Sequence, residues 1–268
     1  MITKDYPPPS FYMQQEQIER RKLEAKVNAR FRKALCDYAL IEDNDRILIG
    51  LSGGKDSLAL LQLLGKQAQI HVPKIEVMAA HVSVTNIGYQ VDLQYLQEQC
   101  DKVGVKFHHF TTDFDETIEP DKSKCFICSW QRRKTLFKAA QTLNCNKIAL
   151  GHHMDDIVET LLLNMVYQGT MGTMPPKLKM DKFDLTIIRP LCLNFEQDLK
   201  RWETYQEYKQ QIKTCPFEKE SSRTDVKELL ETLKQQNPNV LQTIWRSMEN
   251  VRTQYLPHKI TNKEVYNN

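Results

Sequence analysis

Short apolar runs alternate with amphipathic stretches through the middle of the chain, and this pattern predicts an α/β fold. Apolar runs typical of buried strands occur at 46–51, 75–82, 106–110, 147–151 and 185–188. Helical patterns follow the first four of them, at 57–65, 91–103, 129–144 and 155–167. Helices between consecutive strands predict a parallel sheet with helices on both faces. Ligands bind such sheets at the carboxyl ends of the strands.

The flanking segments are predicted to be helical. A charged helical pattern from residue 13 to about 41 precedes the first strand, after a lead-in with three consecutive prolines. Three further helical patterns follow the last strand, at 194–211, 224–236 and 240–255. We therefore expect three regions: an N-terminal lead-in and basic helix at 1–42, an α/β domain at 43–192 and a helical C-terminal region at 193–268.

Charge and composition narrow the compartment and the partners. The net charge of +3 over 268 residues gives no global basic field, but Met13–Cys36 holds seven Lys or Arg against three Glu. That surplus is typical of a solvated helix face or of a surface that contacts nucleic-acid phosphates. No run reaches the roughly 18 apolar residues of a membrane span, and the N-terminus lacks a signal-peptide core. We expect a cytoplasmic protein with no membrane partner.

The stretch SGGKDS, residues 52–57, follows the first predicted strand and indicates a phosphate-binding loop. Its glycines let backbone N–H groups approach an oxyanion closely. Lys55 adds a positive charge, and Ser57 begins a helix whose N-terminus favours anions. The common G-x-x-x-x-G-K-[ST] loop does not fit, because the glycine spacing is one residue short and Asp56 replaces the hydroxyl. The alternative is a tight strand-to-helix turn with an incidental lysine.

A second polar loop, GHHMDD, follows the fourth predicted strand. Asp155 and Asp156 are expected to cap the next helix or, functionally, to organise magnesium on nucleotide phosphates. His152 and His153 could ligate a metal, although sequence neighbours rarely face the same ion. A third charged segment follows Phe110. The three loops are expected to meet at one edge of the sheet.

The seven cysteines predict metal, redox or core roles rather than disulfides. Cys125 and Cys128 form a C-x-x-C pair, which is open to zinc, iron–sulfur and redox readings. Its expected position in a polar loop before a helix makes the redox reading less fitting. Cys215, in the polar stretch KTCPFEKES, is the best third ligand. Three others are expected to be core thiols: Cys36, Cys100 and Cys145.

The loop SGGKDS resembles the pyrophosphate loop of the ATP-pyrophosphatase (PP-loop) superfamily, whose enzymes cleave ATP between the α and β phosphates and adenylate a substrate oxygen. The resemblance implies an adenine nucleotide alpha hydrolase-like fold. It also implies that the nucleotide is held by Ser52, Gly53, Gly54, Lys55, Asp56, Ser57, Gly151 and His152.

A longer set of motifs is similar to the tRNA 2-thiocytidine biosynthesis (TtcA) family. In order, the set is SGGKDS, CFICSWQRR, KIALGHHMDDIVETLLLNM, MPPKL, IIRPL and a later cysteine, and the similarity covers about residues 20–256. It implies an ATP-dependent tRNA sulfurtransferase that adenylates the C2 oxygen of an anticodon-loop cytidine and replaces it with sulfur, releasing AMP and pyrophosphate.

That resemblance also implies cofactors, partners and roles. Cys125, Cys128 and Cys215 would hold a [4Fe–4S] cluster with one iron lacking a protein ligand. ATP and Mg2+ would take part, together with tRNA, a cysteine desulfurase or other sulfur donor, and a homodimeric assembly. The residues it assigns to catalysis are Lys55, Asp56, Arg132, Asp155 and Asp156. Arg132 could instead belong to a solvated helix start.

Two departures from the family pattern keep other readings open. The family usually has a second cysteine three residues before Cys215, where this chain has Ile212, and the loop HVSVTNIGYQ lacks a proline-glycine segment. One alternative is a related PP-loop enzyme that thiolates a different tRNA base or forms an amide. The other is a non-catalytic zinc- or nucleotide-binding RNA adaptor.

Overall fold

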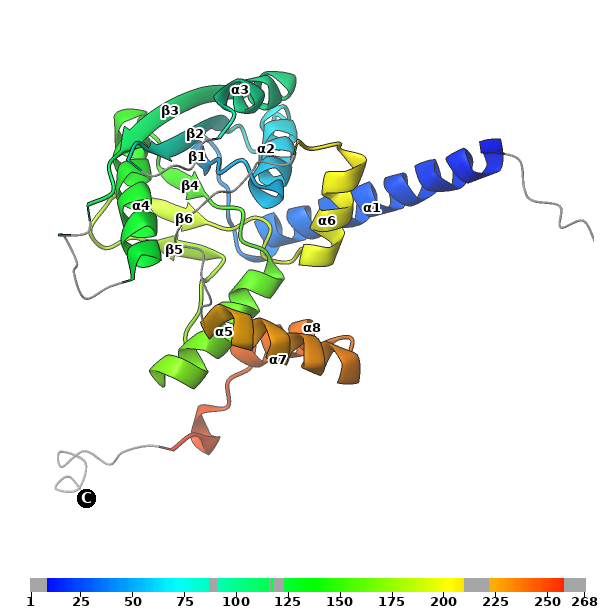
Figure 1. Cartoon of the computed structure of the whole chain (residues 1–268), viewed down its shortest axis with the longest axis vertical. Helices are drawn as coiled ribbons and strands as arrows, with labels where there is room; N and C mark the ends of the chain where they lie inside the picture. The colour runs from blue at the N-terminus through cyan, green and yellow to red at the C-terminus, as the bar shows by residue number, and fades with distance from the viewer. Residues whose placement is uncertain (1–8, 87–90, 116, 118–122, 210–221, 258–268) are drawn as a thin grey trace, which may run out of the picture.

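A computed structural model of the chain describes residues 9–86, 91–115, 117, 123–209 and 222–257. Its centre is a sheet of six strands in the order β3-β2-β1-β4-β6-β5 (Figure 1). The strands are β1 Arg46–Gly50, β2 Glu76–Val84, β3 Lys106–Thr112, β4 Lys147–Ala149, β5 Lys177–Lys179 and β6 Thr186–Ile188. Neighbouring strands are parallel except for β5, which pairs antiparallel with β6.

Helices cover both faces of this sheet, as the sequence pattern predicts. They are α1 Pro9–Asp37, α2 Lys55–Ala68, α3 Leu93–Lys102, α4 Lys124–Thr142, α5 Met154–Gln168, α6 Glu196–Tyr205, α7 Ser222–Gln236 and α8 Val240–Glu249, followed by a short 3-10 turn at Thr253–Tyr255. Strand β1 shows the two-sided burial directly. Ile47 and Ile49 belong to the core that includes α2, whereas Leu48 belongs to the core beneath α4. Alternate residues of one strand therefore enter opposite hydrophobic layers.

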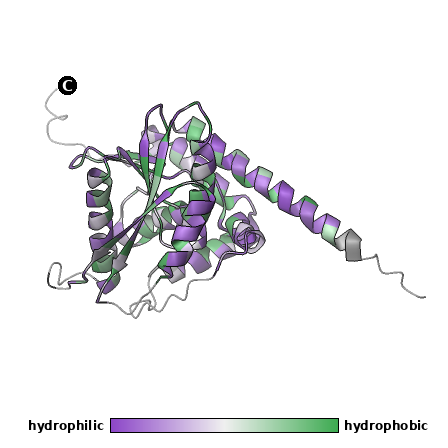
Figure 2. Ribbon diagram, turned by 90° about the horizontal axis from the view of Figure 1, so that it is seen from above, coloured by the Kyte–Doolittle hydropathy of each residue, from purple (hydrophilic) through white to green (hydrophobic). Residues whose placement is uncertain are grey.

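The terminal helical regions join the larger of these two cores. Val27 and Phe31 of α1 are buried in it, as are Leu230 of α7 and Trp245 of α8. The N-terminal half of α1 instead projects away from the body (Figures 1 and 2), and its described side chains from Met13 to Lys22 are exposed. Across the helices that the structure describes, none has the length and apolar character needed to cross a bilayer.

Three local predictions are wrong. Strand β5 was not expected, so the sheet is mostly rather than wholly parallel. Helix α4 begins at Lys124 rather than near 129, because the Ser123 side chain caps it by accepting a hydrogen bond from the Phe126 N–H at 3.3 Å. The C-x-x-C pair therefore lies on the first turns of a helix and not in a loop. Cys36 is exposed rather than in the core.

Candidate functional site

The predicted phosphate loop lies at the point where the order of the strands in the sheet reverses. Strand β1 lies between β2 and β4, so the chain crosses to opposite sides of β1 in successive units. The loops after β1 and β4 meet at this crevice, which is where open α/β sheets bind ligands. A Cβ on Gly151 would lie 3.0 Å from the backbone carbon of Asp56 and 3.1 Å from the Ser57 nitrogen. The two loops are thus in direct backbone contact, as predicted.

The SGGKDS loop is shaped by its own short-range hydrogen bonds. Gly53 has a φ of 86°, a left-handed conformation that favours glycine. The Ser52 hydroxyl accepts a bond from the Gly54 N–H at 3.3 Å, and the Ser57 hydroxyl donates to the Gly54 carbonyl at 2.9 Å. No side chain of the described residues caps α2 at Gly54. The first N–H groups of this helix are therefore available to an anion.

Lys55 contributes a charged amine at this helix start. Its Nζ lies 2.9 Å from Asp56 Oδ2 and 3.8 Å from Glu196 Oε1. Burial alone would lower the pKa of Lys55, but the Asp56 carboxylate, with Glu196 and Asp156 beyond it, raises that pKa overall. The amine is therefore protonated at neutral pH and supplies a positive charge for phosphate oxygens.

Two carboxylates and a histidine face each other beside the loop. Asp56 Oδ1 is buried and has no hydrogen-bond partner among the described residues; it lies 4.0 Å from His153 Nε2. Asp156 Oδ2 lies 3.4 Å from the same nitrogen. Burial raises the pKa of Asp156, and the nearby Asp56 charge adds to this although His153 opposes it. Burial and the neighbouring Asp56 charge both destabilise the ionised form of Asp156. A cation bound beside the two carboxylates would therefore be stabilised.

The carboxylates of Asp56 and Asp156 suit a magnesium ion that is also bound by phosphate and water. They suit less well a metal site that is closed by protein ligands alone. Mg2+ is usually bound by one or two carboxylates together with phosphate oxygens and water. Within the described ranges, no three or more His, Cys, Asp and Glu side chains gather as a metal-binding group. Asp56 and Asp156 are thus two carboxylates that could bind magnesium together with phosphate oxygens and water.

Asp155 shares His153 with its neighbour, since its Oδ2 lies 3.7 Å from His153 Nδ1, but among the described residues it also has partners that Asp156 lacks. Its Oδ2 accepts the Glu196 backbone N–H at 2.8 Å, and its Oδ1 lies 3.1 Å from Lys234 Nζ. It also takes no part in capping α5. The cap is His153, whose Nδ1 accepts the Asp156 N–H at 3.4 Å while Asp156 Oδ2 accepts the His153 N–H at 3.0 Å. The expectation that both aspartates cap the helix is thus correct for Asp156 only.

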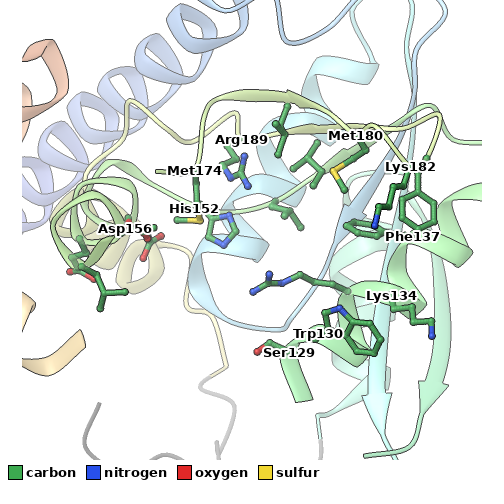
Figure 3. Close-up of a pocket in the computed structure, with 18 of the residues that line it drawn as sticks. Ser129, Trp130, Lys134, Phe137, His152, Asp156, Met174, Met180, Lys182 and Arg189 are labelled. Carbon is green, nitrogen blue, oxygen red and sulfur yellow. Dashed lines mark hydrogen bonds between the residues drawn. The ribbon is translucent and has the colours of Figure 1, made fainter. Parts of the chain in front are cut away.

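Two cavities near the phosphate loop share one wall. The smaller, about 270 Å³, lies at the ends of β1 and β2 and includes Ser52 and Arg132 in its lining. The larger, about 770 Å³, lies between α4, α5 and the β5–β6 pair (Figure 3). The shared wall consists of Ser129, Arg133, Leu150 and His152.

The larger cavity has mainly apolar walls with charges at a few points. Its apolar lining includes Phe137, Leu163, Met174, Leu178, Met180, Phe183 and Ile187. Trp130, Glu159 and Arg189 also line this cavity; they lie within the sequence motifs but were not predicted as individual site residues. Arg189 could have been noticed, because it is a charged residue placed directly after the apolar strand β6 and before a proline.

The cysteine pair lies at the edge of these cavities. Cys125 is exposed and Cys128 is half-buried, and residues three apart share one face of a helix. Ser129, directly after Cys128, lines both cavities. Cys192 is a further buried cysteine of the described residues. Burial raises the pKa of its thiol to about 12, which disfavours the thiolate form that binds a metal. The proposed third ligand, Cys215, lies outside the described residues.

Comparisons with known proteins give consistent results. A family profile described as "PP-loop domain" matches residues 21–227. The chain is 36% identical over 241 residues to a tRNA-cytidine(32) 2-sulfurtransferase of Geotalea uraniireducens, covering 88% of this chain and 95% of that protein. It is 37% identical over 232 residues to a protein of the same name from Geobacter sulfurreducens, covering 84% and 89%.

A solved structure is also similar along most of its length. It is the U34-tRNA thiolase NcsA from Methanococcus maripaludis with its [4Fe–4S] cluster. The TM-score is 0.74 at 25% sequence identity, covering 89% of this chain and 82% of that chain.

Proposed function

Because the chain belongs to the PP-loop domain family, we propose that it is an ATP-dependent tRNA sulfurtransferase that forms 2-thiocytidine in the anticodon loop. The relatives named tRNA-cytidine(32) 2-sulfurtransferase support this activity and make cytidine 32 the expected target. The structural observation that carries the proposal is the shared wall, Ser129, Arg133, Leu150 and His152, between two cavities beside the phosphate loop. One cavity would take the nucleotide and the other the target base.

In the first step the C2 oxygen of cytidine attacks the α-phosphorus of ATP, and pyrophosphate leaves. The leaving pyrophosphate would lie against the uncapped N-terminus of α2, with Lys55 neutralising part of its charge. Asp56 and Asp156 would hold magnesium, which neutralises phosphate charge when bound. Arg132, in the wall of the smaller cavity, would contact the nucleotide or the adenylate.

In the second step a sulfide-level sulfur adds at C2 and AMP leaves, carrying the former C2 oxygen. The reaction has no net electron transfer, since an oxygen at C2 is replaced by a sulfur of the same oxidation level. Cys125, Cys128 and Cys215 would hold a [4Fe–4S] cluster, whose iron lacking a protein ligand would present the sulfur when bound. The pair on α4 would place that chemistry beside Ser129 at the cavity wall.

The RNA would be held in part by α1. Several of its cations are paired within the protein, such as Arg30 with Asp198 at 2.5 Å and Lys33 with Asp37 at 2.6 Å. The exposed projecting half also carries Arg20, Arg21 and Lys22, of which Arg20 pairs with Glu24 at 3.4 Å and Lys22 with Glu19 at 3.0 Å on the solvent-exposed helix surface. These basic residues would contact backbone phosphates and give no base specificity.

The proposal is tested by mass spectrometry of tRNA nucleosides from a strain that lacks the gene. We expect 2-thiocytidine to disappear and other thionucleosides to persist. A plasmid with the wild-type gene should restore 2-thiocytidine, whereas one with Lys55→Met should not. Unchanged 2-thiocytidine in the deletion strain would refute the activity.

The structural neighbour supports one other candidate, thiolation of a tRNA uridine. In that case the same experiment removes a 2-thiouridine and leaves 2-thiocytidine in place. A non-catalytic RNA adaptor would release no AMP from ATP with any tRNA.

A further inference from the structure

The larger cavity contains a buried cation that the two steps above do not use. Arg189, 6% exposed, follows β6 and lines this cavity. Its Nη1 donates to the Pro175 carbonyl at 2.5 Å, and its backbone N–H donates to the Pro176 carbonyl at 2.8 Å. Its Nε is buried and has no hydrogen-bond partner among the described residues. The side chain is therefore fixed through Nη1, while Nη2 has no hydrogen-bond partner among the described residues and, unlike Nε, is not fully buried, so a ligand in the cavity can reach it.

Arg189 is a charged side chain without a partner carboxylate among the described residues, so a hydrogen-bond acceptor on a ligand would stabilise it. Burial lowers its pKa to about 10, and the nearby Arg133 adds to this. The side chain nevertheless stays charged at neutral pH. None of the carboxylates that the structure describes forms an ion pair with it. A buried charged donor without an acceptor is costly, so a ligand that offers an acceptor at this position gains affinity.

The remaining walls suit a flat aromatic ligand. Trp130 is 36% exposed in the wall formed by α4, with Lys134 Nζ 5.0 Å from its ring centroid. Phe137 and Phe183, whose ring centroids are 5.6 Å apart, form another part of the lining. Figure 3 shows Trp130 across the cavity from Arg189 and Met174. Aromatic and apolar walls of this kind accept bases that are unstacked from RNA.

We propose that the target pyrimidine, extruded from the RNA, binds in the larger cavity with its ring nitrogen N3 accepting a hydrogen bond from Arg189 Nη2. This inference rests on the proposed function. The C2 oxygen must reach the α-phosphate at the wall shared with the nucleotide cavity, so it cannot remain bound to Arg189 through the reaction. Of the two ring nitrogens next to C2, N1 carries the ribose. N3 is therefore the acceptor that persists.

This contact makes Arg189 a specificity-determining residue. N3 of cytosine is an acceptor, whereas N3 of uracil carries a hydrogen. A uracil in the same pose would point its N–H at the guanidinium and leave two buried donors unpaired. Sites built around such a hydrogen bond discriminate strongly against analogues that lack it.

The test removes the contact from each side in turn. The substrates are anticodon stem-loop RNAs with cytidine or 3-deazacytidine, which has a C–H in place of N3, at the target position. AMP release from ATP is measured in single turnover, with inorganic sulfide as the sulfur source, for wild-type protein, Arg189→Lys and the surface control Arg246→Lys. We expect 3-deazacytidine to slow the wild type and Arg246→Lys by roughly 10–100-fold, the range for a hydrogen bond to a charged group.

In Arg189→Lys we expect a similar loss with cytidine, a KM for ATP close to that of the wild type, and little further loss with 3-deazacytidine. An equal penalty for 3-deazacytidine in wild type and Arg189→Lys would overturn the contact. Equal rates with both RNAs in the wild type would overturn it even if Arg189→Lys failed to fold. If wild-type protein released no AMP with the cytidine RNA, the proposed function would fail, and this inference with it.

Discussion

Asp155 and Asp156 are consecutive in the sequence and both lie near His153, yet within the described part of the chain only Asp155 forms an ion pair with a lysine of the C-terminal helices. Asp155 Oδ1 lies 3.1 Å from Lys234 Nζ of α7, whereas Asp156 Oδ2 lies 3.4 Å from His153 Nε2 beside the phosphate loop. One carboxylate joins the C-terminal helices to α5, and the other borders the larger cavity. Substitutions at the two positions should therefore have separable effects.

Asp155→Asn should mainly lower stability. The amide can still accept the Glu196 N–H, but the ion pair with Lys234 is lost, and the free energy of unfolding should fall by about 1–3 kcal/mol. Urea denaturation of Asp155→Asn, Lys234→Met and the double variant measures the coupling. Stability like that of the wild type, combined with lost AMP release, would instead return Asp155 to a magnesium-binding role.

Asp156→Asn should impair the reaction without a loss of stability. Burial raises the Asp156 pKa in the folded protein, so its ionised form opposes folding at neutral pH. The variant should be at least as stable as the wild type at pH 7, and any gain should vanish as the pH falls below the ordinary carboxyl pKa of 3.8. The Mg2+ concentration for half-maximal AMP release should rise roughly 10–100-fold. An unchanged magnesium requirement would argue against this ligand.

The cysteine pair gives a third prediction, with an internal control. Cys128→Ser and Cys125→Ser should lose bound iron and the brown absorbance of anaerobically prepared protein. Cys36→Ser changes an exposed thiol on α1 and should keep both. Iron content and the visible spectrum are the measurements. Wild-type iron in Cys128→Ser would rule out the cysteine as a cluster ligand.

Gly151→Ala tests the backbone contact between the two loops. The added Cβ would lie 3.0 Å from the Asp56 backbone, which cannot move aside as a flexible side chain can. Overpacking of this kind costs about 1–3 kcal/mol, and here it should displace the phosphate loop and weaken ATP binding. Gly172→Ala is the matched control, because nothing lies within 4 Å of its added Cβ. Equal ATP affinity in the two variants would contradict the contact.

The sequence predicted the strands that are buried on both faces, because parallel strands produce uninterrupted apolar runs. It did not predict β5, whose residues Lys177–Lys179 are too few to show a period and have exposed lysines at an edge. The start of α4 was predicted too late, because the apolar CFIC segment does not show a helical period that would identify Ser123 as the cap.

The first of these errors explains what was missed in the site. The larger cavity is closed on one side by the β5–β6 pair, and β5 was not in the predicted fold, whereas its α4 lining from Ser129 to Phe137 lies within the predicted helix. The loop residues from 52 to 57 needed only local pattern and were placed correctly beside Gly151. Arg189 acquires its role only from packing against Pro175 and Pro176, which a linear pattern does not contain.

The charge distribution along the projecting half of α1 has a consequence for how tRNA is captured. At about 1.5 Å per residue, the segment from Pro9 to Lys22 reaches roughly 20 Å. Its cations Arg20, Arg21 and Lys22 lie at the base of this segment, next to the buried Leu23, whereas Pro9–Glu19 contains two Glu and no Lys or Arg. With a screening distance of about 8 Å at physiological salt, the outer part of the segment therefore adds no long-range attraction for tRNA, and shortening it before Arg20 should leave the salt dependence of tRNA association unchanged.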